Sequence, residues 1–272
     1  ELKSVIQTIV QERIANRQLE ANTATATEEA AAGNPQRGRS SDQVRSNGDP
    51  FDLLDYLMME EDTDKELKQT EKELLGNVRM FLFAGQDTTA TTLSFALYEL
   101  ACHPCAQKKL QEEVDGLFAS DPKPAYKDLL PLEYLDAVIK EVLRLHAPGG
   151  VARETVDRPI TLAQGETKYV IPARTTIYTF PSLTGLSVGD DFAPERFLTK
   201  NGKQDSSFMP FSVGPRNCVG QPLAMSELKV ILAHMVRRYN VQKTPGNEDP
   251  IKVVLLTIKA HRIMLDFEKR SL

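Results

Sequence analysis

The stretch of sequence that decides the fold surrounds a single cysteine near the end of the chain. It reads Phe211-Ser212-Val213-Gly214-Pro215-Arg216-Asn217-Cys218-Val219-Gly220-Gln221-Pro222. Two glycines and two prolines turn and stiffen the backbone around Cys218, and Pro222 suits the first turn of a helix that begins there. A buried, inert cysteine is the plainer interpretation, but it does not explain the glycines, prolines and arginine placed around the thiol.

The start of a helix favours a negatively charged sulfur. Backbone N–H groups of the first turn have no partners within the helix, and the helix dipole is positive there. Both effects stabilise a thiolate at Cys218. A thiolate held in a narrow loop is what a haem iron takes as a strongly electron-donating axial ligand. The sequence therefore predicts Cys218 as a metal ligand.

A long helix is predicted over about residues 65–101. Its centre, residues 80–85, is apolar on all sides, so we expect it to be buried. A Gln-Asp-Thr-Thr sequence follows at once, where packing alone would not place polar groups. Gly85 and Thr88 lie three residues apart on one helix face, which predicts a hydroxyl beside a small gap. The alternative is that Asp87 and Thr88 only cap a second helix.

A second apolar-periodic helix, predicted over residues 135–145, contains Glu141 and Arg144. Residues three apart on a helix face each other, and the aliphatic neighbours of this pair favour its burial. A buried ion pair needs a third partner for its remaining hydrogen bonds, and Arg196 in a later irregular segment is the candidate. Between Arg144 and Arg196, apolar and polar residues alternate over residues 151–179, and Gly165 and Pro172 interrupt the alternation. This pattern predicts short strands joined by turns.

The first fifty residues differ from the rest of the chain. Apolar residues at three- and four-residue spacing predict a helix near residues 2–14. Residues 21–50 are rich in small and polar side chains and have only Val44 as a sizeable aliphatic residue. Such a stretch cannot bury enough apolar surface to offset the cost of ordering it, so we predict a flexible linker.

Composition disfavours several classes of protein. The 272 residues include 33 Lys and Arg against 38 Asp and Glu, a formal charge of −5, which disfavours nucleic acid as the main partner. Three cysteines cannot form a disulfide framework. Cys102 and Cys105 have CxxC spacing, but the sequence has no second pair of zinc ligands to accompany them. The longest apolar run is far too short to span a bilayer.

Five segments, taken in order, resemble the C-terminal half of the cytochrome P450 family of haem-thiolate monooxygenases. They are Ala84-Gly85-Gln86-Asp87-Thr88-Thr89, Glu141-x-x-Arg144, Arg153, Pro194-Glu195-Arg196-Phe197 and Phe211-x-x-Gly214-x-Arg216-x-Cys218-x-Gly220. The resemblance implies a mainly α fold with small β-sheets, in which a long central helix, the haem-binding loop, a last helix and C-terminal strands follow one another. Residues 1–272 would form a single partial domain of this fold, with the 21–50 linker inside it.

The resemblance also implies a site for haem b, with Cys218 as the axial thiolate on the iron. Further contacts with the haem would come from Phe211, Gly214, Gly220, Arg216 and Arg153. The two arginines suit the haem propionates because their charge is permanent.

Other matching residues imply roles away from the thiolate. Ala84 and Gly85 would leave room for dioxygen, and Asp87 and Thr88 would deliver the protons that O–O cleavage needs. A buried structural triad would be formed by Glu141, Arg144 and Arg196. Residues 180–191 are shorter than the family's usual segment and lack its His and Trp, which leaves the packing around Arg196 open.

The reaction that the resemblance implies is insertion of one oxygen atom from O2 into an apolar small molecule, with electrons from an NADPH-dependent cytochrome reductase. Membrane contact would be made only by an N-terminal anchor outside this chain, on the endoplasmic reticulum membrane. Two alternatives stay open: a catalytically incompetent remnant of such an enzyme, and a haem-thiolate enzyme that rearranges hydroperoxides. The Asp87–Thr88 pair favours the monooxygenase, because hydroperoxide rearrangement needs no proton relay to dioxygen.

Overall fold

The computed structural model of the chain describes residues 5–15, 70–154, 157–198, 208–246 and 249–271. The linker predicted at residues 21–50 lies outside this part of the chain. The chain divides into two compact units, one that ends at Ala84 and one that begins at Gly85, and each is described by itself.

The first unit has a small apolar core between two helices. A helix over residues 5–15 contributes Ile6 and Val10, and the start of helix α3 (Glu71–Cys102) contributes Leu74 and Leu75. All four side chains are buried. The helix predicted at the beginning of the chain is therefore present and uses its apolar face as its spacing indicates.

Helix α3 begins with a reciprocal cap. The N–H of Thr70 donates to the Glu73 carboxylate at 2.7 Å, and the N–H of Glu73 donates to Thr70 Oγ1 at 3.3 Å. Further along the helix, Met80, Leu82 and Phe83 are 64%, 48% and 43% exposed. The prediction that this apolar segment is buried was wrong. An all-apolar stretch shows what a helix could bury, but burial needs covering elements, and these three side chains keep between 43% and 64% of their surface exposed.

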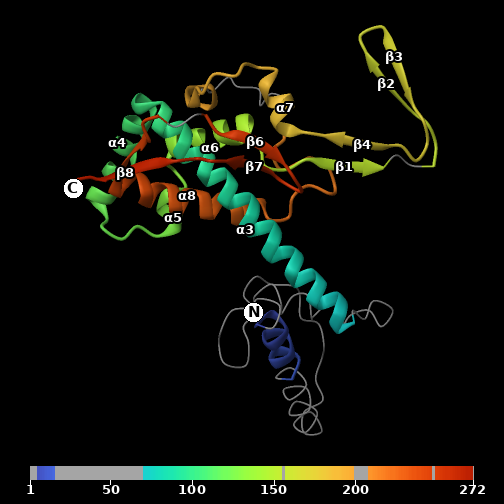
Figure 1. Cartoon of the computed structure of the whole chain (residues 1–272), viewed down its shortest axis with the longest axis horizontal. Coiled ribbons are helices and arrows are strands. Elements are labelled where there is room, and N and C mark those ends of the chain that lie inside the picture. Colours follow the sequence, from blue (N-terminus) through green and yellow to red (C-terminus); the bar gives the residue numbers. More distant parts are fainter. Residues whose placement is uncertain (1–4, 16–69, 155–156, 199–207, 247–248, 272) are drawn as a thin grey trace, which may run out of the picture. The chain divides into compact units, whose positions relative to one another are not determined.

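The second unit is mainly helical (Figure 1). After the end of α3, its helical elements are α4 (Pro104–Ser120), α5 (Tyr126–Leu129), α6 (Glu133–His146), α7 (Pro181–Leu186), the 3-10 turn η1 (Pro194–Phe197) and α8 (Gln221–Arg238). Helix α6 confirms the helix predicted from apolar spacing over residues 135–145, and α8 begins where Pro222 predicts it. Helix α7 was not predicted.

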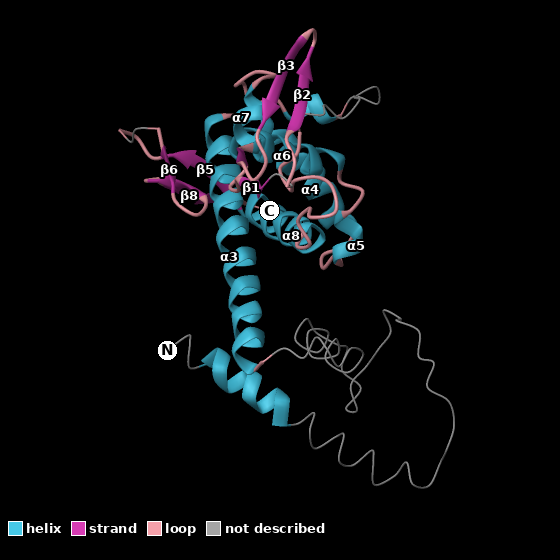
Figure 2. Cartoon of the chain, turned by 90° about the vertical axis from the view of Figure 1, so that its right-hand side faces the viewer, coloured by secondary structure: helices cyan, strands magenta, loops and turns pink. Residues whose placement is uncertain are grey.

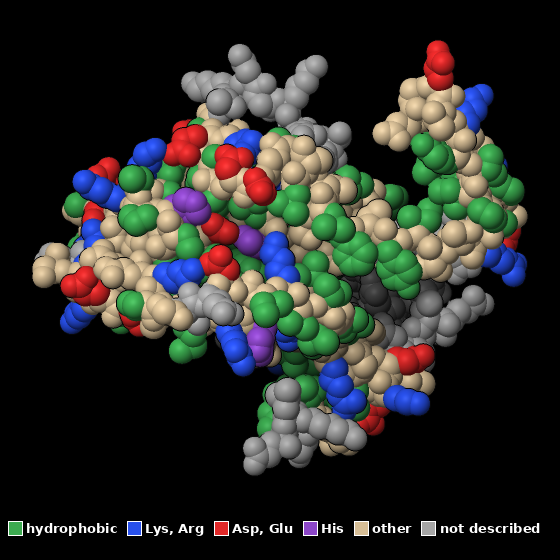
Figure 3. Space-filling model, turned by 45° about the horizontal axis from the view of Figure 1, so that its top comes forward, with side chains coloured by type: hydrophobic (Ala, Val, Ile, Leu, Met, Phe, Trp, Pro, Cys, Tyr) green, Lys and Arg blue, Asp and Glu red, His purple; other side chains and the backbone are tan. Residues whose placement is uncertain are grey.

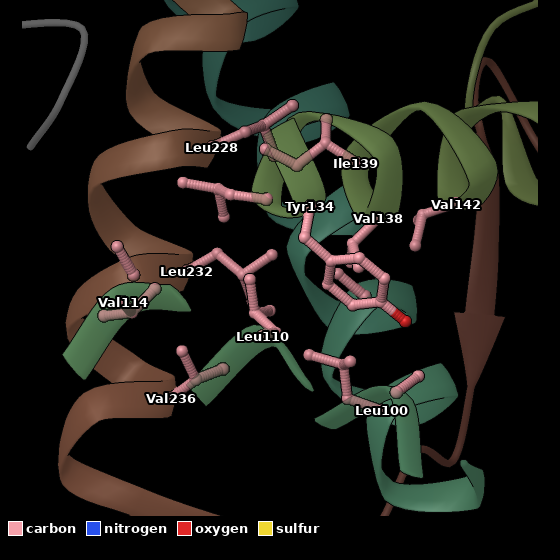
Figure 4. Close-up of a cluster of buried hydrophobic side chains, with 14 of the residues drawn as sticks. Leu100, Leu110, Val114, Tyr134, Val138, Ile139, Val142, Leu228, Leu232 and Val236 are labelled. Atoms are coloured by element: carbon pink, nitrogen blue, oxygen red, sulfur yellow. The ribbon is translucent and has the colours of Figure 1, made fainter. Parts of the chain in front are cut away.

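The core of this unit lies between α4, α6 and α8 and includes the end of α3 (Figure 4). Leu110 from α4, Val138 from α6 and Leu232 from α8 are each completely buried. Burial of such a side chain contributes about 1.5–3 kcal/mol. The labelled side chains of Figure 4 come from all four helices and point toward one another, so this cluster fixes the frame on which the later loops are built.

The strands form pairs rather than one large sheet (Figure 2). Within the described residues there are four pairs, and each is antiparallel. They are β1 (Val151–Glu154) with β4 (Thr176–Thr179), β2 (Ile160–Gln164) with β3 (Thr167–Ile171), β5 (Tyr239–Lys243) with β8 (Leu265–Lys269), and β6 (Ile251–Val254) with β7 (Ile258–His261). The strands predicted within residues 151–179 are thus confirmed. The fold is mainly α with small antiparallel sheets, as the family resemblance implies.

A buried glutamine ties the C-terminal strands to the helices. Gln107 Nε2 on α4 donates to the carbonyls of Leu100 and Val241, at 3.0 and 2.9 Å, and its Oε1 accepts from the N–H of Val241 at 2.8 Å. Because all three bonds are buried, the amide fixes β5 against α4 and the end of α3.

Exposed apolar side chains occur on the hairpins. Leu162, Tyr169 and Val170 of the β2–β3 hairpin are each more than half exposed, and Figure 3 shows green side chains over this hairpin at the upper right. The same view shows acidic and basic side chains interspersed over the rest of the face. None of the described helices combines the length and the apolar character that crossing a membrane requires.

Candidate functional site

Cys218 lies at the end of a closed loop that leads directly into α8. Its backbone N–H donates to the carbonyl of Phe211 at 2.9 Å, and within the loop the N–H of Asn217 donates to the carbonyl of Gly214 at 3.1 Å. Helix α8 begins three residues later, with Pro222 in its first turn. The loop therefore has a fixed backbone that presents Cys218 next to the start of a helix.

Two residues of this loop have left-handed backbone angles. Gly214 has φ +85° and Ser212 has φ +62°. A side chain at Gly214 would be strained by this angle, so the turn itself requires glycine. Gly220 is different: it has no such angle, and a Cβ added there would lie 3.8 Å from Cys218 Sγ, which is an ordinary contact.

The thiol of Cys218 is exposed rather than packed in the core. Three apolar side chains close to it in sequence, Val213, Val219 and Leu223, are 66%, 78% and 61% exposed. The described residues contain no group of three or more His, Cys, Asp or Glu side chains that could hold a metal ion, so a metal here would depend on the single thiolate. A soft thiolate among uncovered apolar side chains suits an iron atom carried in a flat, largely apolar macrocycle. The residues present therefore fit a haem bound through sulfur.

The other predicted haem contacts are placed as follows. Phe211 is half-buried and packs against the main core. Arg216 is exposed at the surface of the loop. The backbone of Arg153 pairs with Ile177 in the β1–β4 hairpin, and its side chain lies outside the part of the chain that is described.

Glu141, Arg144 and Arg196 meet in the structure. The guanidinium of Arg144 donates to both oxygens of Glu141, through Nε to Oε2 at 2.7 Å and through Nη2 to Oε1 at 2.8 Å. Arg196 Nε lies 3.5 Å from Glu141 Oε1, and its Nη2 donates to Asp191 Oδ1 at 3.1 Å. The Glu141 side chain is fully buried, Arg144 is 3% exposed and Arg196 is 27% exposed. The burial that the pair's aliphatic neighbours predict is therefore present.

The buried guanidinium of Arg144 has acceptors that the sequence analysis missed. Nη1 donates to the carbonyls of Gly185 at 2.9 Å and Gly189 at 2.5 Å, and Nη2 donates to the carbonyl of Asp191 at 2.8 Å. Together with the two bonds to Glu141, these occupy all five N–H donors of the side chain. The sequence did offer one signal. A buried arginine needs acceptors for five N–H donors, and a single carboxylate does not supply them, so further acceptors had to be present. The short segment over residues 180–191 meets this need with its backbone.

Asp87 on α3 contacts the β6–β7 hairpin. Thr257 Oγ1 donates to Asp87 Oδ2 at 2.5 Å, and Lys259 Nζ lies 2.5 Å from Oδ1. The hydrogen bond from Lys259, followed by that from Thr257, holds the pKa of Asp87 below its ordinary value, although burial acts in the opposite direction. Neither partner was predicted. The available signal was weak: Thr257 directly precedes β7 and Lys259 lies within it, and residues two apart in extended backbone point to the same side.

The remaining predicted positions lie around Asp87 on α3. Ala84 is the last residue of the first unit and Gly85 the first of the second. A Cβ added at Gly85 would have no neighbour within 4 Å. Thr88 is half-buried, and its carbonyl accepts from Thr92 Oγ1 at 3.0 Å. Helix α3 continues through these residues, so they do not cap a second helix.

Comparison with known proteins identifies the family. The model of the family described as Cytochrome P450 matches residues 2–267 of this chain. This chain belongs to the cytochrome P450 family. Cytochrome P450 3A12 of Canis lupus familiaris is 36% identical over 224 residues, which cover 79% of this P450 chain and 43% of that protein. Cytochrome P450 4F2 of Homo sapiens is 36% identical over 227 residues, 80% of this chain and 42% of that protein.

A third relative matches along most of its own length. Cytochrome P450 3A19 of Capra hircus aegagrus is 34% identical over 190 residues, which cover 67% of this chain and 85% of that protein. This P450 chain thus spans less than half the length of the canine and human relatives that it matches. All these cytochromes P450 belong to a family that in general carries a haem-thiolate cofactor, and the geometry at Cys218 fits such a group.

Proposed function

We propose that this P450 chain provides the haem-binding part of a monooxygenase. The reaction is insertion of one oxygen atom from O2 into an apolar organic substrate, with electrons from an NADPH-dependent reductase. A haem held by a thiolate supplies the oxygen-activating chemistry when it is bound. The observation that supports this most directly is the exposed thiol of Cys218 on a hydrogen-bonded loop before α8.

In this proposal, different residues of the chain bind the cofactor and transfer protons. Cys218 holds the cofactor through its sulfur. Arg216 and Arg153 bond the propionates, for which a permanent charge with several donors is suited. Asp87 and Thr88 move protons toward the site of oxygen cleavage, while the small residues before them leave space.

The buried charged network has a structural task in the same proposal. Glu141, Arg144 and Arg196 join α6 to the backbone of residues 185–196, which precede the cysteine loop. Because their hydrogen bonds are directional and buried, these residues hold the segment before the loop in one arrangement.

The test is the absorption spectrum of the full-length protein, loaded with haem, reduced and bound to carbon monoxide. A thiolate ligand gives the family's red-shifted Soret band. Cys218→Ala removes the only sulfur that we place on the iron and should abolish this band. Retention of the red-shifted band by this variant would remove Cys218 from the role of ligand.

Cys105→Ala is the matched control. Cys105 is also exposed, and it also lies in the first turn of a helix, α4, but without the closed glycine- and proline-containing loop. Its replacement should leave the red-shifted band unchanged. Loss of the band in both variants would point to a general effect of cysteine replacement on folding.

The two alternative functions give different results in the same preparation. A monooxygenase forms product only when O2, NADPH and the reductase are all supplied. A hydroperoxide-rearranging enzyme forms product from a lipid hydroperoxide alone, with no reductant. A remnant takes up no haem and shows no band. Location on the endoplasmic reticulum membrane remains a proposal that rests on the family resemblance.

A further inference from the structure

The β6–β7 hairpin holds both carboxylate oxygens of Asp87. The hydroxyl of Thr257 binds Oδ2 and the ammonium of Lys259 binds Oδ1, each at 2.5 Å. Thr257 is 6% exposed, and the Asp87 side chain is 18% exposed. Because each oxygen has its own partner on a separate residue, the carboxylate cannot rotate without breaking one of the two bonds.

The hairpin is itself fixed to the end of α6. The N–H of Ile258 donates to the carbonyl of Pro148 at 2.8 Å, and Lys252 Nζ donates to the carbonyl of Leu145 at 2.9 Å. Ile258, which lies between the two residues that contact Asp87, is 8% exposed. The position of Thr257 and Lys259 is therefore set by backbone contacts and burial rather than by the aspartate alone.

The two contacts also fix the charge of the aspartate. A neighbouring cation and a hydroxyl donor both favour the ionised form of a carboxyl group. The pKa of Asp87 is accordingly held below its ordinary value, so Asp87 is a carboxylate at neutral pH. Lys259 is 42% exposed, so its ammonium keeps contact with solvent while it binds Asp87.

We infer that Thr257 and Lys259 are positioning residues that hold the Asp87 carboxylate in one orientation, in which it accepts a proton from solvent and passes that proton on to Thr88. This inference rests on the proposed function, because it concerns the same proton delivery. Lys259 and Thr257 act through Asp87 and touch neither substrate nor cofactor in this assignment.

The contact itself is tested by a double-mutant cycle on thermal stability, which requires no catalysis. Lys259→Met should lower the melting temperature by about 1–2 °C, because the pair is partly exposed. In an Asp87→Asn background the same change should have almost no effect, since the charge that Lys259 meets is gone. Lys269→Met, which removes an exposed lysine from β8, should give equal small effects in both backgrounds. Equal effects of Lys259→Met on the melting temperature in the two backgrounds would show that Lys259 does not contact Asp87.

The positioning role is tested by the fate of electrons in the reconstituted full-length enzyme. Each NADPH that does not lead to product can instead reduce O2 to hydrogen peroxide. Lys259→Met and Thr257→Val should each raise the peroxide formed per NADPH by roughly two- to tenfold, because the freed carboxylate is misoriented. Lys259→Arg keeps the charge and the donor and should restore most of the coupling.

The carbon monoxide spectrum separates this inference from the proposed function. If Lys259→Met keeps the red-shifted band but raises the peroxide yield and Lys259→Arg reverses the rise, the positioning role stands. If the band is kept and the peroxide yield is unchanged or falls, the positioning role is overturned while the haem assignment stands. If the wild-type protein lacks the band, the proposed function fails and the positioning role fails with it. In that case the double-mutant cycle on thermal stability still decides whether Lys259 contacts Asp87.

Discussion

Arg144 and Glu141 form a bidentate pair one turn apart on α6, with Nε 2.7 Å from Oε2 and Nη2 2.8 Å from Oε1. Both charged groups are shielded from solvent, since the side chain of Arg144 is 3% exposed and that of Glu141 is 0% exposed. Desolvation of this kind offsets much of the attraction between the charges. The network is stable because the remaining donors and acceptors also have partners, including the N–H of Ala193, which donates to Glu141 Oε1 at 2.9 Å.

Replacement of Arg144 should therefore be costly. Arg144→Met leaves the buried Glu141 carboxylate without its main partner and should lower the free energy of unfolding by about 3–5 kcal/mol. Arg144→Lys keeps the charge but cannot reach five acceptors from a planar group, so we expect a smaller loss. Urea unfolding of the full-length protein, followed by circular dichroism, measures both. Arg238→Met, which removes an exposed arginine from the end of α8, should stay within about 0.5 kcal/mol of wild type. A similar loss in all three variants would contradict the special role of the buried pair.

Close approach of α7 to α6 gives a second prediction. A Cβ added at Gly185 would lie 2.3 Å from the carbonyl oxygen of Arg144 and 2.9 Å from its Cγ. Gly185→Ala must therefore push α7 away, and the carbonyl of Gly185 would then be lost as an acceptor for Arg144 Nη1. We expect a loss of about 1–3 kcal/mol in the free energy of unfolding, measured by urea unfolding.

A second helical glycine provides the control. Gly116 on α4 is exposed, and a Cβ added there would have no neighbour within 4 Å. Gly116→Ala should stabilise the protein by about 0.5–1 kcal/mol, because alanine loses less backbone freedom on folding. If Gly185→Ala also proved stabilising, this result would contradict the close approach of α7 to α6 at Gly185.

Sequence patterns predicted the elements of this fold better than the contacts between them. Apolar spacing predicted α6, and the proline at residue 222 predicted the start of α8, because these features depend on neighbours within one or two turns. The Glu141–Arg144 pair could be predicted for the same reason, since both residues lie on one helix face.

Contacts that depend on tertiary structure could not be predicted in this way. Arg144 takes three acceptors from backbone carbonyls more than forty residues away, and a carbonyl has no sequence signature. Asp87 meets Lys259 only because a hairpin folds back onto α3. Burial of the apolar segment at residues 80–85 was predicted and is not observed, since composition does not say which element covers a helix. The roles assigned to Cys218 and its neighbours remain predictions.

A third ionic contact ties the end of the chain to the helices and predicts a pH dependence. Asp115 on α4 lies 2.6 Å from Arg270 Nη2 and 2.9 Å from Arg237 Nη1 on α8. Arg270, which follows β8, also donates to the carbonyl of Val236 at 3.0 Å. Burial raises the pKa of Asp115, but the hydrogen bonds from Arg270 and then Arg237 outweigh it, so the net pKa lies below the ordinary value.

The sign of the pH effect follows from this lowered pKa. In the unfolded chain the carboxyl group titrates near its ordinary pKa of about 3.9. Above that pH, Asp115 is ionised in both states and its two arginine contacts stabilise the folded state. As the pH falls through the lower pKa of the folded state, the group becomes protonated and this contribution is lost. Asp115→Asn should therefore destabilise the protein at pH 7, and its effect should become smaller as the pH falls below the ordinary pKa.

Melting temperatures of wild-type and Asp115→Asn protein between pH 3 and pH 7 measure this difference. The Asp115 side chain is 34% exposed, so we expect only about 1 kcal/mol at pH 7 after solvent screening. Glu268→Gln removes an exposed carboxylate from β8, close to Arg270 in sequence, and should change the melting temperature little at any of these pH values. A constant difference between wild type and Asp115→Asn from pH 7 to pH 3 would mean that the aspartate stabilises the fold by packing, because only a charged contact disappears when the carboxyl group is protonated.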